Sequence, residues 1–107
     1  MPQHIVPLPP MVIVNGSSYS NAITLFDDAS ALTIFSPASL TGVVTIETEP
    51  TSTGTNFTTL QSGGSDVTLP AGKSTVINKI GWHQMRLASA ATEAAARAFP
   101  VNKSVNV

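Results

Sequence analysis

The chain has no cysteine and very little charge, and each shortage excludes a class of protein. Without cysteine there are no disulfide bonds and no thiolate zinc sites, so stability must come from packing. Charged residues make up 10% of the 107 residues, whereas about 25% is usual, and apolar residues make up 42%. Ser and Thr are more than twice as numerous as charged residues, so hydroxyl groups or a partner must keep the surface soluble.

The low charge also bears on partners. The net charge is -1, and the basic residues are too scattered to neutralise a run of phosphates: Lys73, Lys79, Arg86, Arg97 and Lys103. No segment reaches the roughly 20 apolar residues of a membrane span. The start, "MPQHIVPLPPMVIVNG", has no basic region and its apolar stretch is interrupted by prolines, unlike a signal peptide. The sequence therefore predicts neither a nucleic-acid nor a membrane partner.

What the chain does contain is a series of short β-like runs about ten residues apart, which is typical of an all-β sandwich or barrel. The runs are "NAITLFD", "ALTIFS", "VVTIETE", "FTTLQ", "DVTL", "STVINKI", "WHQMRLAS" and "ARAFPVN". This length suits one domain. The sequence predicts a single-domain β-sandwich over residues 15–107, of jelly-roll or immunoglobulin-like type.

The alternation of apolar and polar residues within these runs indicates which side of each strand faces the core. In "VVTIETE", Val44 and Ile46 share the core side, whereas Glu47 and Glu49 share a side expected to face water. The other residues predicted to point inward are Val67, Leu69, Met85, Leu87, Phe99 and Val101.

Turn residues separate the runs. Gly63 and Gly64 suit a tight hairpin, and "LPAG" suits a type I turn with Pro70 second and Gly72 fourth. Residues 90–98 are ambiguous: "SAATEAAARAF" favours a short helix with a Glu–Arg pair four residues apart, but a segment this short also fits a strand.

Patterns that resemble catalytic or binding motifs are incomplete. "AGKST" ends like a phosphate-binding loop, but Val67 stands where that motif needs its first glycine, so Lys73 is read as an exposed turn residue. Glu47 and Glu49 lie about 6.6 Å apart by strand rise, near the spacing of an inverting glycosidase, but they lack a cleft.

Metal ligands are equally sparse. Asp27 and Asp28 lack a calcium loop, and His83 has neither a cysteine nor a second histidine nearby. We therefore predict no catalytic residue, no cofactor and no metal site.

The stretch "HIVPLPPMVIV" is apolar but held extended by its prolines. Residues 1–14 are expected to form an extended N-terminal arm or an edge strand, the strand beginning near Met11, and both alternatives stay open. If the arm reaches a neighbouring subunit, the expected contact residues are Ile5, Val6, Leu8 and Met11. On this hypothesis, removal of residues 1–10 weakens attachment and leaves the body folded.

From about Ala31 to Val101, the order "ALTIFSP", "LTGVVTIETEPTSTGTNFTTLQSGG", "DVTLPAGKSTVI", "QMRLASAATEAAARAFPV" resembles small structural proteins of tailed bacteriophages with a β-sandwich or jelly-roll fold. Such proteins occur as capsid cement or decoration proteins. The resemblance implies a non-enzymatic virion protein, assembled in the host cytoplasm, that binds the major capsid protein or other virion proteins. A surface rich in hydroxyls also suits packing against copies of itself, and a homo-oligomer, with a trimer favoured, is expected.

Two alternatives remain at the level of sequence. The first is a tail, collar or head-to-tail component of the same virion. The second is a small carbohydrate-binding module, because such sandwiches hold sugars on an aromatic platform. The candidate aromatic residues are Tyr19, Phe26, Phe35, Phe57, Trp82 and Phe99.

Overall fold

The computed structural model describes residues 3–24, 29–50, 56–78, 82 and 84–106, and this part of the chain contains strands and turns but no helix. The prediction of an all-β protein is confirmed. The strands are β1 (Gln3–Ile13), β2 (Ile23–Thr24), β3 (Ala29–Phe35), β4 (Val44–Glu49), β5 (Thr58–Thr59), β6 (Gln61–Ser62), β7 (Ser65–Asp66), β8 (Ser74–Asn78), β9 (Gln84–Ser89) and β10 (Arg97–Asn106).

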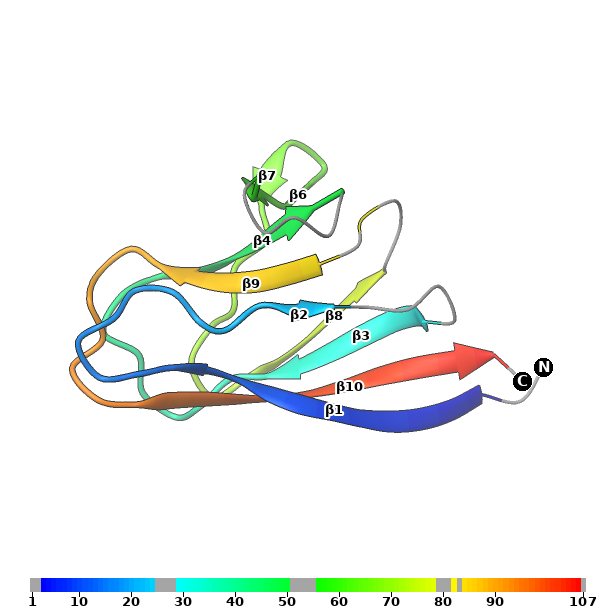
Figure 1. Cartoon of the computed structure of the whole chain (residues 1–107), viewed down its shortest axis with the longest axis horizontal. Coiled ribbons are helices and arrows are strands. Elements are labelled where there is room, and N and C mark those ends of the chain that lie inside the picture. The colour runs from blue at the N-terminus through cyan, green and yellow to red at the C-terminus, as the bar shows by residue number, and fades with distance from the viewer. Residues whose placement is uncertain (1–2, 25–28, 51–55, 79–81, 83, 107) are drawn as a thin grey trace.

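These strands form two four-stranded sheets and a hairpin, and all pairs are antiparallel. Sheet 1 has the order β1-β10-β3-β8, sheet 2 has the order β2-β9-β4-β5, and β6 pairs with β7 (Figure 1). The pairs are nested along the chain, because β1 pairs with β10, β2 with β9, β3 with β8 and β4 with β5. Strands β1 to β4 therefore alternate between the two sheets.

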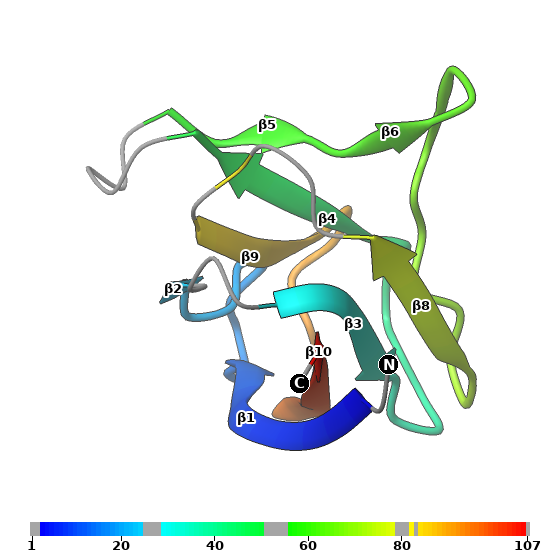
Figure 2. The ribbon, with the colours of Figure 1, turned by 90° about the vertical axis from the view of Figure 1, so that its right-hand side faces the viewer.

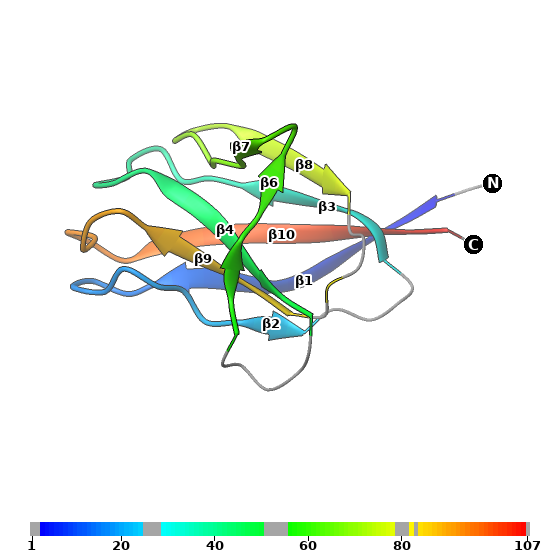
Figure 3. The same ribbon diagram turned by 90° about the horizontal axis from the view of Figure 1, so that it is seen from above.

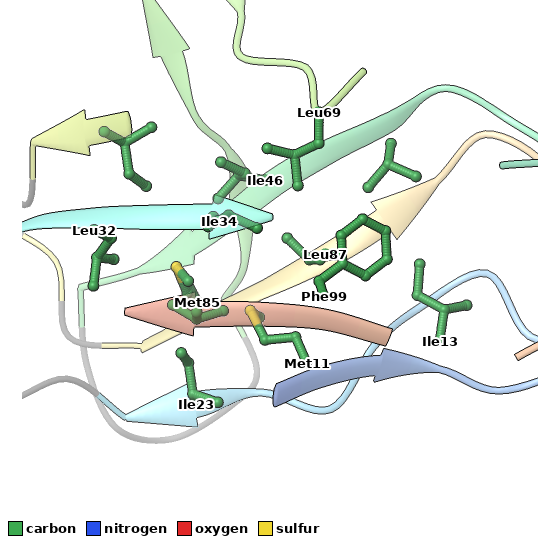
Figure 4. Close-up of a cluster of buried hydrophobic side chains, with 13 residues drawn as sticks. Met11, Ile13, Ile23, Leu32, Ile34, Ile46, Leu69, Met85, Leu87 and Phe99 are labelled. Atoms are coloured by element: carbon green, nitrogen blue, oxygen red, sulfur yellow. The ribbon is translucent and has the colours of Figure 1, made fainter. Parts of the chain in front are cut away.

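The hydrophobic core lies between the two sheets, and both contribute to it (Figure 4). Its members are Met11, Ile13, Ile23, Leu32, Ile34, Val44, Ile46, Leu69, Ile77, Met85, Leu87, Phe99 and Val101. Full burial of a side chain of this size contributes about 1.5–3 kcal/mol, so this cluster is the main source of stability. The inward faces predicted for β4, β9 and β10 are confirmed by the burial of Ile46, Leu87 and Phe99.

The N-terminal stretch is paired within its own sheet from Gln3 onward, well before the edge strand expected near Met11. Pro9 and Pro10 fall in a bulge, because the register with β10 shifts between Leu8 and Met11. A bulge on an edge strand tolerates residues that cannot donate a hydrogen bond. The described residues from Gln3 therefore form an edge strand, and no extended arm projects from them.

Residues 90–96 form bends and irregular backbone, and the chain enters β10 at Arg97, so the helical alternative for residues 90–98 is wrong. The backbone of Glu93 pairs instead with the β1–β2 connection: its N–H donates to the Ser17 carbonyl (2.9 Å), and its carbonyl accepts from the Gly16 N–H (2.8 Å). Tertiary pairing thus outweighs the helix propensity of the alanines, which is small in so short a segment.

Two predicted strands are broken up around the β6–β7 hairpin. "FTTLQ" divides at Leu60, whose N–H donates to the Ile46 carbonyl (2.8 Å) and whose carbonyl accepts from the Val67 N–H (3.0 Å). In "DVTL" only an isolated bridge from Thr68 to Thr45 follows β7. The hairpin lies on the same side of the molecule as β8 (Figures 2 and 3).

The glycine turns follow the sequence closely. Gly63 and Gly64 join β6 to β7 with φ of 62° and 84°, as predicted. The turn before β8 is shifted by one residue, because the Lys73 N–H donates to the Pro70 carbonyl (3.3 Å) and Gly72 has φ of 71°. A positive φ at the third residue indicates a type II turn, so the type I prediction is wrong.

Candidate functional site

The outer face of sheet 1 carries no charge along two complete cross-strand rows. Residues that pair directly across antiparallel strands share a face. The first row is Val76, Thr33, Asn102 and Pro7, and the second is Asn78, Ala31, Ser104 and Ile5. With the pair Phe35 and Ser74, these residues define a surface that we call the neutral face.

Three of the six exposed large apolar side chains among the described residues lie on the neutral face. Ile5 is 61% exposed, Phe35 40% and Val76 67%. Between them lie hydroxyl and amide groups, chiefly Thr33, Asn102 and Ser104, which satisfy hydrogen bonds in several geometries. A face that combines exposed apolar side chains with uncharged polar ones is consistent with a contact surface.

The charged side chains that the structure describes in the strands lie outside the neutral face. Lys103 is on the inner face of sheet 1, because it pairs with Val6 and Leu32 and is 9% exposed. Glu47 and Arg86 pair on the outer face of sheet 2. The two outer faces of the molecule therefore differ in charge.

Arg86 is the centre of a cluster on sheet 2. Its guanidinium carbon lies 4.3 Å from the ring centre of Tyr19 and 4.4 Å from that of Phe57, and its Nε donates to Glu47 Oε1 at 2.7 Å. A guanidinium between two aromatic rings gains both cation–π attraction and packing. The cluster joins β4 and β9 to the segments that carry the two rings.

The paired carboxylates of β4 do not form a catalytic pair. Glu47 is engaged by Arg86, and Glu49 Oε2 accepts from the Asn56 N–H at 2.9 Å. Glu49 is fully buried, so the prediction that it faces water is wrong. The contact with the Asn56 backbone, seven residues further along the chain, is not encoded in the alternation of residues along the strand.

A second buried carboxylate, Glu93, was missed as a site by sequence reasoning. Its Oε1 accepts from the Thr41 N–H (2.8 Å) and Arg97 Nε (2.9 Å), and its Oε2 accepts from the Gly42 N–H (3.1 Å) and Ser89 Oγ (2.7 Å). We call these five residues the Glu93 cluster. It holds together the β3–β4 and β9–β10 connections at one end of the sandwich (Figure 1).

The surroundings of Glu93 favour its charged form. Burial of this carboxyl alone raises its pKa, but the hydrogen bonds from Thr41, Ser89, Arg97 and Gly42 outweigh burial and lower the pKa of Glu93 from 4.5 to about 2. The only signal in the sequence was the spacing of Glu93 and Arg97, which fits a helical pair and the observed turn equally well.

The structure places the four predicted contact residues in different environments. Met11 is fully buried in the core, so its side chain does not reach a partner. Leu8 packs against the core, and Val6 is half-buried on the inner face. Ile5 alone is exposed on the neutral face. The burial of Met11 and Leu8 follows from the pairing of β1 with β10.

A groove of about 530 Å³ lies between β8 and the β6–β7 hairpin. Its lining includes Leu60, Gln61, Val67, Val76, Asn78 and Trp82. The described aromatic side chains are distributed over four places: Trp82 is in this groove, Tyr19 and Phe57 contact Arg86, Phe35 is on the neutral face and Phe99 is in the core.

Other sequence candidates lie outside the described residues or stand alone. Asp27, Asp28, His83 and Phe26 belong to the first group. Within the described residues, no three His, Cys, Asp or Glu side chains come together as a metal site, and no helix is long and apolar enough to cross a membrane. Lys73 is exposed beside its turn. No family model, curated protein or solved structure matches the chain.

Proposed function

We propose that this protein is a non-enzymatic structural component of a tailed-phage virion, a capsid cement or decoration protein that binds the assembled shell through its neutral face. The observation that carries the proposal is the pair of uncharged rows across sheet 1 with Ile5, Phe35 and Val76 exposed on it. A neutral face meets another protein without burying an unpaired charge, which costs several kcal/mol.

The strand order supports a jelly-roll type. In a jelly roll, the chain forms one long hairpin of nested strand pairs, and successive pairs belong to alternate sheets. This arrangement produces the observed orders β1-β10-β3-β8 and β2-β9-β4-β5. An immunoglobulin-like sandwich instead places its first two strands in one sheet, whereas β1 and β2 lie in different sheets here. Viral capsid domains are among the proteins that use the jelly roll.

The size of the neutral face supports assembly in several copies. Four strands about 4.8 Å apart, with β3 paired to β10 and to β8 over five residues of about 3.3 Å each, give an area of roughly 320 Å². A stable interface usually buries about 800 Å² per partner, so one contact through this face is weak. We propose that a homo-oligomer, with a trimer favoured, presents several such faces to the repeating major capsid protein, and that avidity supplies the affinity.

The test compares two equally exposed side chains. Ile5 and Val43 are both 61% exposed, but only Ile5 lies on the neutral face. Purified wild type, Ile5→Lys, Phe35→Lys and Val43→Lys are mixed with phage shells lacking the protein, and bound protein is measured by co-sedimentation. We expect wild type and Val43→Lys to saturate the shells, and the other two to bind about tenfold more weakly.

Equal binding by all four proteins would remove the neutral face from the proposal. A wild-type protein that is monomeric by native mass measurement and binds no shell would overturn the whole function.

A further inference from the structure

The outer edge of β8 is unpaired in the part of the chain that the structure describes. Ser74–Asn78 pair with β3 on one side, and β8 ends the order of sheet 1. The backbone N–H and C=O groups on its other side are therefore available to a further strand.

Strand β8 lacks the features that protect such an edge. It contains no proline and no charged residue, and its register with β3 has no bulge. The opposite edge of sheet 1 is different, because β1 carries Pro7, Pro9 and Pro10 and a bulge. Prolines, charges and bulges are the usual means of blocking an edge, so of the two edges of sheet 1, β8 is the one that lacks them.

The groove beside β8 has the shape and chemistry for a single extended segment. One wall is β8, with Val76 and Asn78, and the other is the hairpin region, with Leu60, Gln61 and Val67. None of the described residues that line it is charged, and Trp82 lies half-buried in it. The hairpin region forms the far wall of the groove, which favours a single extended segment over the edge of a second complete sheet.

We propose that β8 and this groove bind an uncharged, extended peptide segment of a partner protein by strand addition. The backbone of the segment pairs with Ser74–Asn78, and alternate apolar side chains enter the groove beside Trp82. This site differs from the shell contact in the proposed function and overlaps it at one edge: Val76 and Asn78 belong to both the groove and the neutral face.

The single tryptophan of the chain makes the groove directly observable. A blocked peptide of alternating Val and Thr, free of aromatic residues, is titrated into the protein while Trp82 emission is recorded. A second peptide of the same sequence carries N-methyl groups on alternate residues along one edge, and a third carries them along the other edge. We expect a saturable emission change with the unmodified peptide, and binding about tenfold weaker for one or both methylated forms.

Protein variants locate the site. Val76→Asp places a charge in the groove. Val14→Asp is the control, because Val14 lies outside the groove lining and its exposed fraction is similar, 58% compared with 67% for Val76. We expect Val76→Asp to weaken peptide binding about tenfold, whereas Val14→Asp and the neutral-face variant Ile5→Lys bind as wild type does. Circular dichroism confirms that each variant is folded before titration.

Three results would overturn the inference: no emission change up to millimolar peptide, equal affinity for all three peptides, or an emission change with neutral oligosaccharides but not with peptide. The last would assign the groove to sugars. None of these depends on shell binding, so this inference and the proposed function fail independently.

Discussion

The Nε atom of Arg97 lies 2.9 Å from Oε1 of Glu93, four residues earlier, although the chain between them forms a bend and no helix. The Glu93 side chain is fully buried, and that of Arg97 is 17% exposed. A spacing that usually marks a helical ion pair here anchors the connection between two strands of different sheets.

The Glu93 cluster is expected to be a major contributor to stability. Glu93→Gln keeps the size of the side chain but removes the charge that accepts four hydrogen bonds. We expect the free energy of unfolding in urea to fall by about 2–4 kcal/mol, because Arg97 loses its buried partner. Thr92→Ala, at the exposed neighbouring position, is the control and is expected to change it by less than about 0.5 kcal/mol.

The same carboxylate predicts an acid-sensitive fold. The pKa of Glu93 is about 2 in the folded protein against 4.5 for the free side chain. As pH falls through this window the unfolded chain binds the proton first, so stability present above pH 4.5 is lost towards pH 2. Urea midpoints of wild type and Glu93→Gln should differ most above this window and converge near its lower end; a constant difference would contradict the prediction.

Gly42 is required by packing and not by its φ. A Cβ there would lie 2.7 Å from the Ala91 nitrogen and 2.8 Å from Ser89 Oγ, in contact with the Glu93 cluster. We expect Gly42→Ala to destabilise the protein by about 2–3 kcal/mol. At Gly64, whose φ is 84° and whose Cβ would meet nothing within 4 Å, alanine should cost about 1 kcal/mol. Thermal unfolding of both variants tests whether Gly42→Ala destabilises the protein more than the alanine substitution at Gly64 does.

The Arg86 cluster predicts that arginine and lysine are not equivalent at this position. Arg86→Ala removes the contacts with both rings and with Glu47, and we expect a loss of about 1–3 kcal/mol. Arg86→Lys keeps the charge but not the planar guanidinium, so it should recover less than half of that loss. The measurement is urea unfolding of the two variants, with Lys73→Ala at an exposed position as the control. Full recovery of stability by lysine would show that stacking of the guanidinium on the rings contributes nothing.

Removal of residues 1–10 should now affect the body of the protein. These residues include most of β1, and Leu8 packs against the core. We expect the truncated chain to lose at least about 2 kcal/mol of stability by thermal unfolding, since β10 loses a neighbouring strand. Ile5→Lys, which changes only an exposed side chain, should unfold within about 2 °C of wild type. An unchanged unfolding temperature after truncation would mean that β1 is dispensable.

Local patterns in the sequence were sufficient for several strands and for most of their inward residues. Alternation placed Ile46, Leu87 and Phe99 inward, and paired glycines located the β6–β7 turn, because both signals depend only on near neighbours. The same patterns failed for Glu49 and Glu93. Their burial depends on hydrogen bonds from Asn56 and Thr41, which other segments bring close.

The sequence by itself determined an all-β chain without thiol chemistry, the short strands and most of their inward residues. Only the tertiary structure decided which strands are neighbours, and therefore that Ile5, Ser104 and Ala31 lie side by side on one uncharged face. The physical reason is that strand pairing joins backbone groups from opposite ends of the chain, whereas alternation and turn propensity act over a few residues.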